Sequence, residues 1–330
     1  MGKIRAGIIG LGTYVPADVL TNSDLEKLVN TSDEWITSRT GIKERRIIDK
    51  NQAASDIGAI AAAKAIDESG LNPEDIELII CTSLSPDMIA PSTATIIQHK
   101  IKAKNAAAFD VSSACAGFSF GLSVGTQFIE NGTYNNVLLI GTEAISRFID
   151  YSDRKTCILF GDGAGAVVLA KVEEPYGIVA NYLGADGNRH EHIRIPAGGS
   201  SVPASEETVL NGEHFLKMNG NEVFKFAVRV IPQAIDNVLQ IAGLKKEDID
   251  LFIPHQANKR IIDSAIEKAG IDENKVFINL DKYGNTSTAS VPLALGEARE
   301  NGLLKKGDLT LLIGFGAGLS WGANIVCWAL

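Results

Sequence analysis

Cysteine is scarce in this chain, which has four in 330 residues. They are widely spaced and form no CxxC pair; they are Cys81, Cys115, Cys157 and Cys327. This argues against a disulfide framework and a zinc ribbon, since both need several suitably spaced cysteines. No GxxxxGK[ST] motif occurs, so a P-loop nucleotide site is excluded. We therefore expect reduced thiols, no bound metal and a cytoplasmic location.

Basic residues are also in deficit. The 31 Lys and Arg are outnumbered by 40 Asp and Glu, which gives a net charge of −9. The phosphate backbone of nucleic acids attracts clustered positive charge, so an acidic protein is a poor nonspecific nucleic-acid binder. We expect no nucleic-acid partner.

One segment without charge is long enough to cross a membrane, Leu309–Leu330. Its polar residues and its glycines, which include Gly314 and Gly316, interrupt the apolar run. The segment therefore predicts two buried strands joined by a glycine turn, and no membrane span.

The chain contains an internal repeat. Ser69–Ile80 and Ala242–Ile253 are identical at seven of twelve positions, at a constant offset of 173 residues. In each copy an amphipathic helical pattern leads through a turn into an apolar strand. The expected helices cover Ala59–Glu68 and Pro232–Ile241, and the expected strands cover Ile76–Cys81 and Ile249–Pro254.

A second pair of segments supports a duplication. The run Asn136–Glu143, followed by Ile158–Ala170, is similar to Leu309–Val326, and all consist of apolar strand patterns broken by glycine. We predict two α/β halves, residues 1–175 and 176–330, with mostly parallel sheets covered by helices. The polar stretch Gly184–Gly212 predicts long loops near a site.

Two glycine motifs loosely fit a dinucleotide-binding fingerprint. Gly10-Leu-Gly12 is followed by Val15 and Pro16 instead of a glycine-started helix, and is interpreted as a turn after the first strand. The other motif, Gly161–Gly165, leads into a strand, so it lacks the helix N-terminus that binds pyrophosphate. Both patterns disfavour a nicotinamide-dependent oxidoreductase.

Cys115 is a candidate nucleophile. It lies in a turn of small residues between the strand-like run that begins at Phe109 and a helix expected from Phe118 to about Glu130. Free backbone N–H groups at a helix start favour the thiolate. The alternative is an inert buried thiol, which is how the other three cysteines are interpreted.

Two further residues complete a Cys–His–Asn set. His255 directly follows an expected strand, and Asn285 lies in a turn before an expected helix. The offset between Cys115 and Asn285 is 170, close to that of the repeat, and His255 corresponds to a position near Thr82. The duplication thus predicts that the three side chains converge between the halves. A purely structural histidine is the alternative.

The motifs SSACAGF (112–118), PHQAN (254–258) and GNTS (284–287) resemble those of the β-ketoacyl-[acyl-carrier-protein] synthase III family of the thiolase superfamily. The segments 31–46, 153–166 and 219–225 are similar to that family too. The resemblance implies a thiolase-like α/β fold of two duplicated halves in an α-β-α-β-α layering. The N-terminal half would carry the nucleophile Cys115, and the C-terminal half His255 and Asn285.

The resemblance also implies the reaction. Cys115 would take the acyl group of acetyl-CoA or a similar primer. Malonyl-[acyl carrier protein] would then lose CO2, with His255 and Asn285 as hydrogen-bond donors, and give the 3-oxoacyl product that initiates fatty-acid synthesis. The backbone N–H groups of Cys115 and Ala317 would form the oxyanion hole. Acyl-CoA is a substrate, and no cofactor is implied.

The binding residues implied by the same resemblance form three groups. For CoA and pantetheine they are Trp35, Arg39, Arg154, Gly220, Phe224, Ala257 and Asn258. For the acidic carrier protein they are Lys225, Gln256, Ala257, Asn258, Lys259 and Arg260, with Lys268 as a further cation. Ala90 would line the acyl pocket and, being small, would leave room for longer or branched primers. A homodimer is implied as well.

Two other functions use similar residues. A starter-unit synthase of a polyketide or related secondary-metabolite pathway would share the whole set. A cysteine hydrolase would also use Cys and His, but it would release a free acid.

Overall fold

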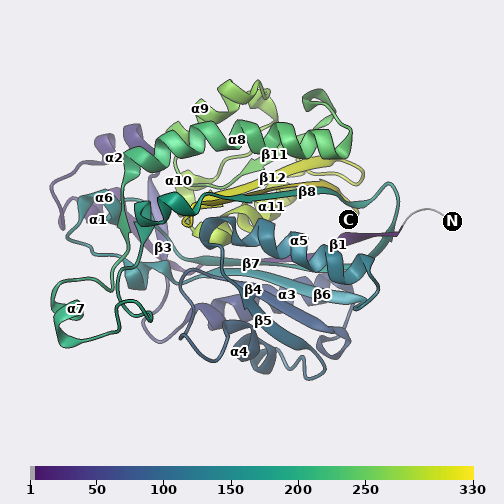
Figure 1. Ribbon diagram of the computed structural model, residues 1–330, viewed down its shortest axis with the longest axis horizontal. Helices are drawn as coiled ribbons and strands as arrows, with labels where there is room; N and C mark the ends of the chain where they lie inside the picture. Colours follow the sequence, from purple (N-terminus) through teal and green to yellow (C-terminus); the bar gives the residue numbers. More distant parts are fainter. Residues whose placement is uncertain (1–3) are drawn as a thin grey trace.

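The computed structural model describes residues 4–330, which fold into five layers (Figure 1). Helices α8 and α9 cover a four-stranded sheet, α5 and α11 form the middle layer, and α3 and α4 cover a five-stranded sheet. These helices are α3 (Ala54–Ser69), α4 (Thr93–Lys100), α5 (Gly117–Glu130), α8 (Gly220–Ala242), α9 (Lys259–Ala269) and α11 (Ser290–Glu300). The α-β-α-β-α layering predicted from the sequence is confirmed.

The two sheets draw on separate parts of the chain. The five-stranded sheet has the order β1 (Ile4–Tyr14), β7 (Gly163–Glu173), β6 (Asn136–Glu143), β4 (Leu78–Thr82) and β5 (Ala107–Val111). The four-stranded sheet has the order β11 (Leu251–Pro254), β12 (Leu309–Gly316), β13 (Ser320–Cys327) and β8 (Gly177–Ala185). The sheets thus lie on either side of residue 175 in the sequence, and a domain boundary at that residue stays a prediction.

The expectation of mostly parallel sheets is wrong. Strand β4 runs parallel to β5 and β6, and β11 runs parallel to β12. The other four pairings, β1–β7, β6–β7, β12–β13 and β13–β8, are antiparallel. In the second sheet the cause is the three-residue turn 317–319, which reverses the chain between β12 and β13. This hairpin is the pair of buried strands predicted for the uncharged C-terminal run.

The repeat is a structural duplication at a constant offset. The starts of β4 and β11 differ by 251 − 78 = 173 residues, and those of β6 and β12 by 309 − 136 = 173. The short 3-10 turns Ala114–Ala116 and Ser287–Ala289 differ by 287 − 114 = 173 as well. Cys115 therefore corresponds to Thr288, whereas Asn285 lies three residues earlier. His255 corresponds to Thr82, because 255 − 82 = 173.

The core continues from one sheet to the other through helix α5. Phe118 and Leu122 of this helix belong to one buried cluster with Leu139 of β6 and Leu312 of β12. Since α5 packs on both sheets, its burial holds the two halves together. Within residues 4–330, no helix is long and apolar enough to span a membrane.

Gly10 and Gly12 lie inside β1 and not in a turn after it, so that expectation is wrong. A Cβ atom on Gly10 would lie 2.1 Å from the Ala65 carbonyl oxygen, and one on Gly12 would lie 2.2 Å from that of Ala61. The glycines are required because the α3 backbone packs directly on the strand.

We predict that Gly12→Ala lowers the free energy of unfolding by about 1–3 kcal/mol, the usual range for overpacking, because the added methyl group must displace α3. Urea unfolding measures the change. Gly199→Ala is the matched control, since no atom lies within 4 Å of its added methyl group. Equal stabilities of the two variants would contradict the packing argument.

Candidate active site

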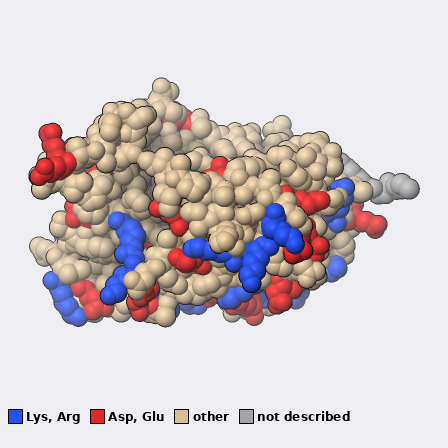
Figure 2. Space-filling view, turned by 90° about the horizontal axis from the view of Figure 1, so that it is seen from below, with Lys and Arg blue, Asp and Glu red and all other residues tan. Residues whose placement is uncertain are grey.

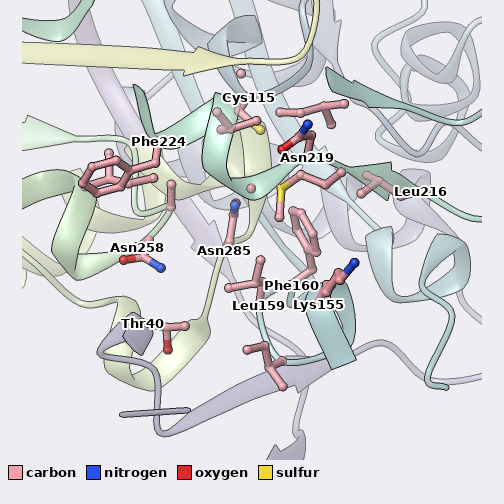
Figure 3. Close-up of a pocket in the computed structure, with 18 of the residues that line it drawn as sticks. Thr40, Cys115, Lys155, Leu159, Phe160, Leu216, Asn219, Phe224, Asn258 and Asn285 are labelled. Carbon is pink, nitrogen blue, oxygen red and sulfur yellow. The ribbon is translucent and has the colours of Figure 1, made fainter. Parts of the chain in front are cut away.

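A cavity of about 790 Å³ lies between the two halves and contains Cys115, His255 and Asn285 in its wall. Figure 3 shows Cys115 and Asn285 facing the same space from different segments of the chain. The convergence of these three side chains, predicted from the repeat, is what the structure shows.

Cys115 belongs to the 3-10 turn between β5 and α5. Ala114 before it has a left-handed φ of 45°, which turns the chain sharply at the end of the strand segment. Strand β12 of the other half lies close against this turn. A Cβ atom on Gly316 would lie 2.7 Å from the Cys115 Cβ and 3.0 Å from its Sγ. As a result Cys115 is buried, with 8% of the residue exposed.

Burial raises the pKa of the Cys115 thiol to about 12, and the nearby Glu143 carboxylate acts in the same direction. The sequence-based expectation of a thiolate is therefore wrong for the free protein, because desolvation outweighs the N–H groups at the start of α5. The sulfur is a neutral thiol in the free protein.

His255 lies at the carboxyl end of β11. Its backbone N–H donates to the Ile313 carbonyl of β12 (2.7 Å), and its ring packs edge-on against Phe315. Nδ1 lies 2.6 Å from the Ser290 hydroxyl. Burial lowers the pKa of His255 to about 3, so the imidazole is neutral at pH 7.

Asn285 is held by the chain on both sides. Its N–H donates to the Leu159 carbonyl (2.8 Å), and its own carbonyl accepts from Gly161 (3.1 Å). The side-chain Oδ1 accepts the Ser287 backbone N–H at 2.8 Å. With the oxygen so occupied, the amide nitrogen is left to point into the cavity, as Figure 3 shows. Asn285 therefore offers a hydrogen-bond donor.

The cavity wall is positively charged. Arg39, Lys155 and Arg260 line it, and among the described residues no Asp or Glu does. This local excess of cations contrasts with the overall charge of −9. The cavity thus favours an anionic ligand.

Most residues assigned to CoA and pantetheine lie at this cavity. Its lining includes Trp35, Arg39, Gly220, Phe224, Ala257, Asn258 and also Ala317. Arg154 does not line it, although its guanidinium lies 4.7 Å from the centre of the Trp35 ring, a cation–π distance. Asn258 donates to the Arg39 carbonyl (3.2 Å) and so ties α9 to α2 (Asp33–Thr40).

Two predicted residues lie elsewhere. Ala90 is exposed in the loop between β4 and α4 and does not line the cavity of its own chain. Gln256 is 1% exposed, and its amide donates to the Pro254 carbonyl (2.7 Å) and accepts from the Asn279 N–H (3.0 Å). Its side chain is closed to a protein partner, so that assignment is wrong.

Of the other carrier-protein candidates, Ala257 is buried, Asn258 is half-buried, and the cations lie at the surface. Lys225 forms an ion pair with Glu222 (2.7 Å), and Lys259 forms one with Asp263 (2.7 Å). Both pairs are exposed and contribute little to stability, so these lysines can exchange partners.

Sequence reasoning missed several apolar lining residues, for example Leu84, Phe160, Leu216 and Met218. They were missed because they come from three distant segments that meet only in the folded chain. It also missed Glu143 at the end of β6, a buried carboxylate that accepts from the Leu84 N–H (3.0 Å) and the Ser85 hydroxyl (2.5 Å). Within residues 4–330, no group of three His, Cys, Asp or Glu could hold a metal ion.

Comparison with known proteins identifies close relatives. The family model described as 3-oxoacyl-[acyl-carrier-protein (ACP)] synthase III matches residues 109–187, and that of its C-terminal part matches 239–328. The beta-ketoacyl-[acyl-carrier-protein] synthase III of Caldanaerobacter subterraneus subsp. tengcongensis is 55% identical over 327 residues, 99% of each chain.

Solved structures agree with this similarity. The 3-oxoacyl-[acyl-carrier-protein] synthase III of Aquifex aeolicus VF5 is 46% identical, with a TM-score of 0.91 over 98% of this chain and all of that chain. The priming beta-ketosynthase of the R1128 polyketide pathway is 34% identical, with a TM-score of 0.91 over 100% and 98%.

The low pKa of His255 makes a prediction about stability. Below pH 6.5, the pKa of His255 in the unfolded chain, the unfolded chain binds a proton at this residue. The folded chain does not bind that proton until the pH falls to about 3. Stability therefore falls as the pH drops through this window, by about 2 kcal/mol from this group between pH 7 and pH 5. Between pH 7 and pH 5, we expect the free energy of unfolding of His255→Gln to fall by about 2 kcal/mol less than that of the unmodified protein.

Urea unfolding of both proteins at pH 7 and pH 5 measures the difference. His190→Gln, which changes an exposed histidine, is the matched control for the substitution. The same pH dependence in His255→Gln and the unmodified protein would show that His255 is not buried as a neutral ring.

Proposed function

The chain belongs to the 3-oxoacyl-[acyl-carrier-protein] synthase III family, and from this premise we propose how its residues carry out the condensation. It is a condensing acyltransferase of fatty-acid synthesis. The proposal is that Cys115, His255 and Asn285 condense an acyl-CoA primer with malonyl-[acyl carrier protein]. The observation that carries this assignment is their convergence on one cavity with a cationic wall.

In the first step the Cys115 sulfur attacks the thioester carbonyl of acyl-CoA. The new carbon–sulfur bond replaces the bond to CoA, and the thiol proton ends on the departing CoA thiol. Negative charge develops on the carbonyl oxygen, and we assign its stabilisation to the backbone N–H groups of Cys115 and Ala317. Ala317 lines the same cavity as Cys115, which supports this role.

In the second step malonyl-[acyl carrier protein] loses CO2, and the electron pair of the broken bond becomes an enolate on its thioester. His255 and Asn285 donate hydrogen bonds to the enolate oxygen. The neutral state of His255 and the inward amide nitrogen of Asn285 support these roles. The enolate carbon then attacks the acyl-Cys115 thioester and releases the thiolate, giving 3-oxoacyl-[acyl carrier protein]. This sequence needs no cofactor or metal.

The cations of the site suit ligands that carry phosphate. We assign Trp35, Arg39 and Arg154 to the nucleotide part of CoA, because the Trp35 ring and the Arg154 guanidinium already stack. Lys225, Lys259, Arg260 and Lys268 provide the basic surface for an acidic carrier. Ion pairs with neighbouring acids hold two of these lysines in the free protein.

We propose that the enzyme is a cytoplasmic homodimer. Its cysteines are free and buried, as expected in a reducing compartment. Strand β5 is an edge of its sheet, and Met88 and Ile89 beyond β4 expose large apolar side chains. Figure 2 shows a face with a broad area of few charges above a zone where both signs are interspersed. These features favour self-association over nucleic-acid binding.

The assigned roles predict which half-reaction each variant loses. After incubation with acetyl-CoA, intact mass should rise by about 42 Da, one acetyl group on Cys115, and Cys115→Ala should show no adduct. His255→Ala and Asn285→Ala should keep the adduct but decarboxylate malonyl-[acyl carrier protein] about 100-fold more slowly or worse. Cys327→Ala, which changes a buried thiol in β13, is the control and should behave like the unmodified protein.

Three results would count against these roles. An acetyl adduct in Cys115→Ala would exclude Cys115 as the nucleophile. Release of free acetate would indicate a hydrolase. Equal loss of both half-reactions in His255→Ala would contradict the role of His255 as a hydrogen-bond donor. A polyketide starter-unit function is supported less well, by a relative at 34% identity against 55%.

The role of Ala90 yields a prediction about primer length. Ala90 is exposed in its own chain, so it can reach an acyl pocket only in a dimer. We expect activity with octanoyl-CoA as well as acetyl-CoA, and a selective loss of octanoyl-CoA use in Ala90→Phe because the ring fills the pocket. Product chain lengths measure this. A strict acetyl preference of the unmodified enzyme would refute a roomy pocket at Ala90.

A further inference from the structure

Ser290 is the first residue of α11 and lies directly behind the His255 ring. Its side chain is buried, with 1% of the residue exposed, and its hydroxyl oxygen is 2.6 Å from His255 Nδ1. Nothing in the sequence pattern marks this serine, and the reaction steps above do not use it. Its contact with a reacting side chain raises the question of which atom donates.

The direction of this hydrogen bond follows from the other contacts of Ser290. Its Oγ accepts the Gln256 backbone N–H at 3.4 Å. Among residues 4–330, the hydroxyl proton finds one hydrogen-bond acceptor, Nδ1 of His255. A buried hydroxyl donates where an acceptor exists. Ser290 therefore donates, Nδ1 accepts, and the single proton of the neutral ring resides on Nε2.

We infer that Ser290 is a positioning residue that fixes His255 in the tautomer with the proton on Nε2. This inference rests on the proposed function, in which His255 is a hydrogen-bond donor to the enolate oxygen. Since Nδ1 faces Ser290, Nε2 lies on the opposite edge of the ring. The other tautomer would present a lone pair to that oxygen and repel it.

The duplicated half supplies an internal comparison. The residue that corresponds to Ser290 is Gly117, because 290 − 117 = 173, and the residue that corresponds to His255 is Thr82. A Cβ atom on Gly117 would lie 3.0 Å from Thr82 Cβ and 2.9 Å from the Thr288 hydroxyl. The half without an imidazole thus has no side chain at this position. The serine hydroxyl occurs in the half where a ring nitrogen needs a donor.

The fixed tautomer also limits how Cys115 loses its proton. With Nε2 protonated, the neutral ring has no free lone pair on its cavity edge and cannot serve as a base for the thiol. The proton must pass to another acceptor, which in the proposed acylation is the departing CoA sulfur. His255 then acts in decarboxylation and Ser290 acts through it, so both should matter less for acylation.

The tautomer can be measured directly. In protein labelled with ¹⁵N-histidine, the chemical shifts of the two ring nitrogens distinguish the protonated from the unprotonated one, and His255→Gln assigns the signals. We expect Nε2 protonated and Nδ1 unprotonated at pH 7. In Ser290→Ala we expect the two ring-nitrogen shifts of His255 to move toward each other, as both tautomers become populated.

Half-reaction rates test the consequence. Ser290→Ala should slow malonyl decarboxylation roughly tenfold, the effect of one lost hydrogen bond, and leave Cys115 acylation within about twofold. Ser290→Thr, which keeps the hydroxyl, should recover most of the lost rate. Ser123→Ala is the control, because it removes another buried serine hydroxyl, on α5, that donates to a backbone carbonyl. It should match the unmodified enzyme in both half-reactions.

A protonated Nδ1 in the unmodified protein would overturn the inference, and this measurement does not require that Ser290→Ala folds. Unchanged ring-nitrogen shifts in a folded Ser290→Ala, or equal loss of both half-reactions, would also overturn it. If His255→Ala itself keeps full decarboxylation, the proposed function fails instead. If only His255→Ala loses decarboxylation and Ser290→Ala does not, the inference alone fails.

Discussion

The close approach of strand β12 to the turn that carries Cys115 is the contact on which the site depends. Two glycines of β12 allow it: a Cβ atom on Gly314 would lie 2.9 Å from the Ala116 Cα, and one on Gly316 would lie 2.7 Å from the Cys115 Cβ. Because β11 is the parallel neighbour of β12, the same approach brings His255 to the cavity that Cys115 lines. It also buries the sulfur, and burial makes the thiol a neutral group. The approach of β12 is thus the common cause of the position of Cys115 and of the neutral state of its thiol.

The duplication shows how one fold unit came to hold two different arrangements. The pair that corresponds to His255 and Cys115 is Thr82 and Thr288, whose hydroxyls are hydrogen-bonded at 2.8 Å. The residue that corresponds to Gly316 is Glu143, because 316 − 143 = 173. Where glycine leaves space for a thiol in one half, the Glu143 carboxylate fills it in the other and binds the loop after β4. One of the two equivalent positions therefore lies at the cavity, and the other is a buried polar contact between the halves.

The features predicted correctly are those that a local sequence pattern determines. The features that were missed depend on packing between segments that are distant in the sequence. Strand β6, helix α5 and the C-terminal hairpin follow from hydrophobic pattern and glycine placement, and the convergence of Cys115, His255 and Asn285 follows from the repeat and the family motifs. The role of Gly12 did not follow, since it depends on a helix that is distant in sequence and packs on the strand. The charge state of Cys115 did not follow either, because desolvation depends on the whole surrounding structure. The burial of Gln256 was missed for the same reason: its partners Pro254 and Asn279 meet it only in the folded chain.

Fixed positive charges and uncharged polar side chains line the same cavity. Arg39, Lys155 and Arg260 provide fixed positive charge in its wall, which suits the phosphates of CoA and of a carrier-bound pantetheine. The three side chains proposed to react carry no charge, since Cys115 is a thiol, His255 is a neutral ring and Asn285 is an amide. In the proposed reaction, the negative charge of each step would therefore develop on the substrate's own oxygen, in a desolvated site whose donors are already oriented. Hydrogen bonds are strongest under those conditions, and they stabilise the transition state because the donors need no reorganisation when the charge appears.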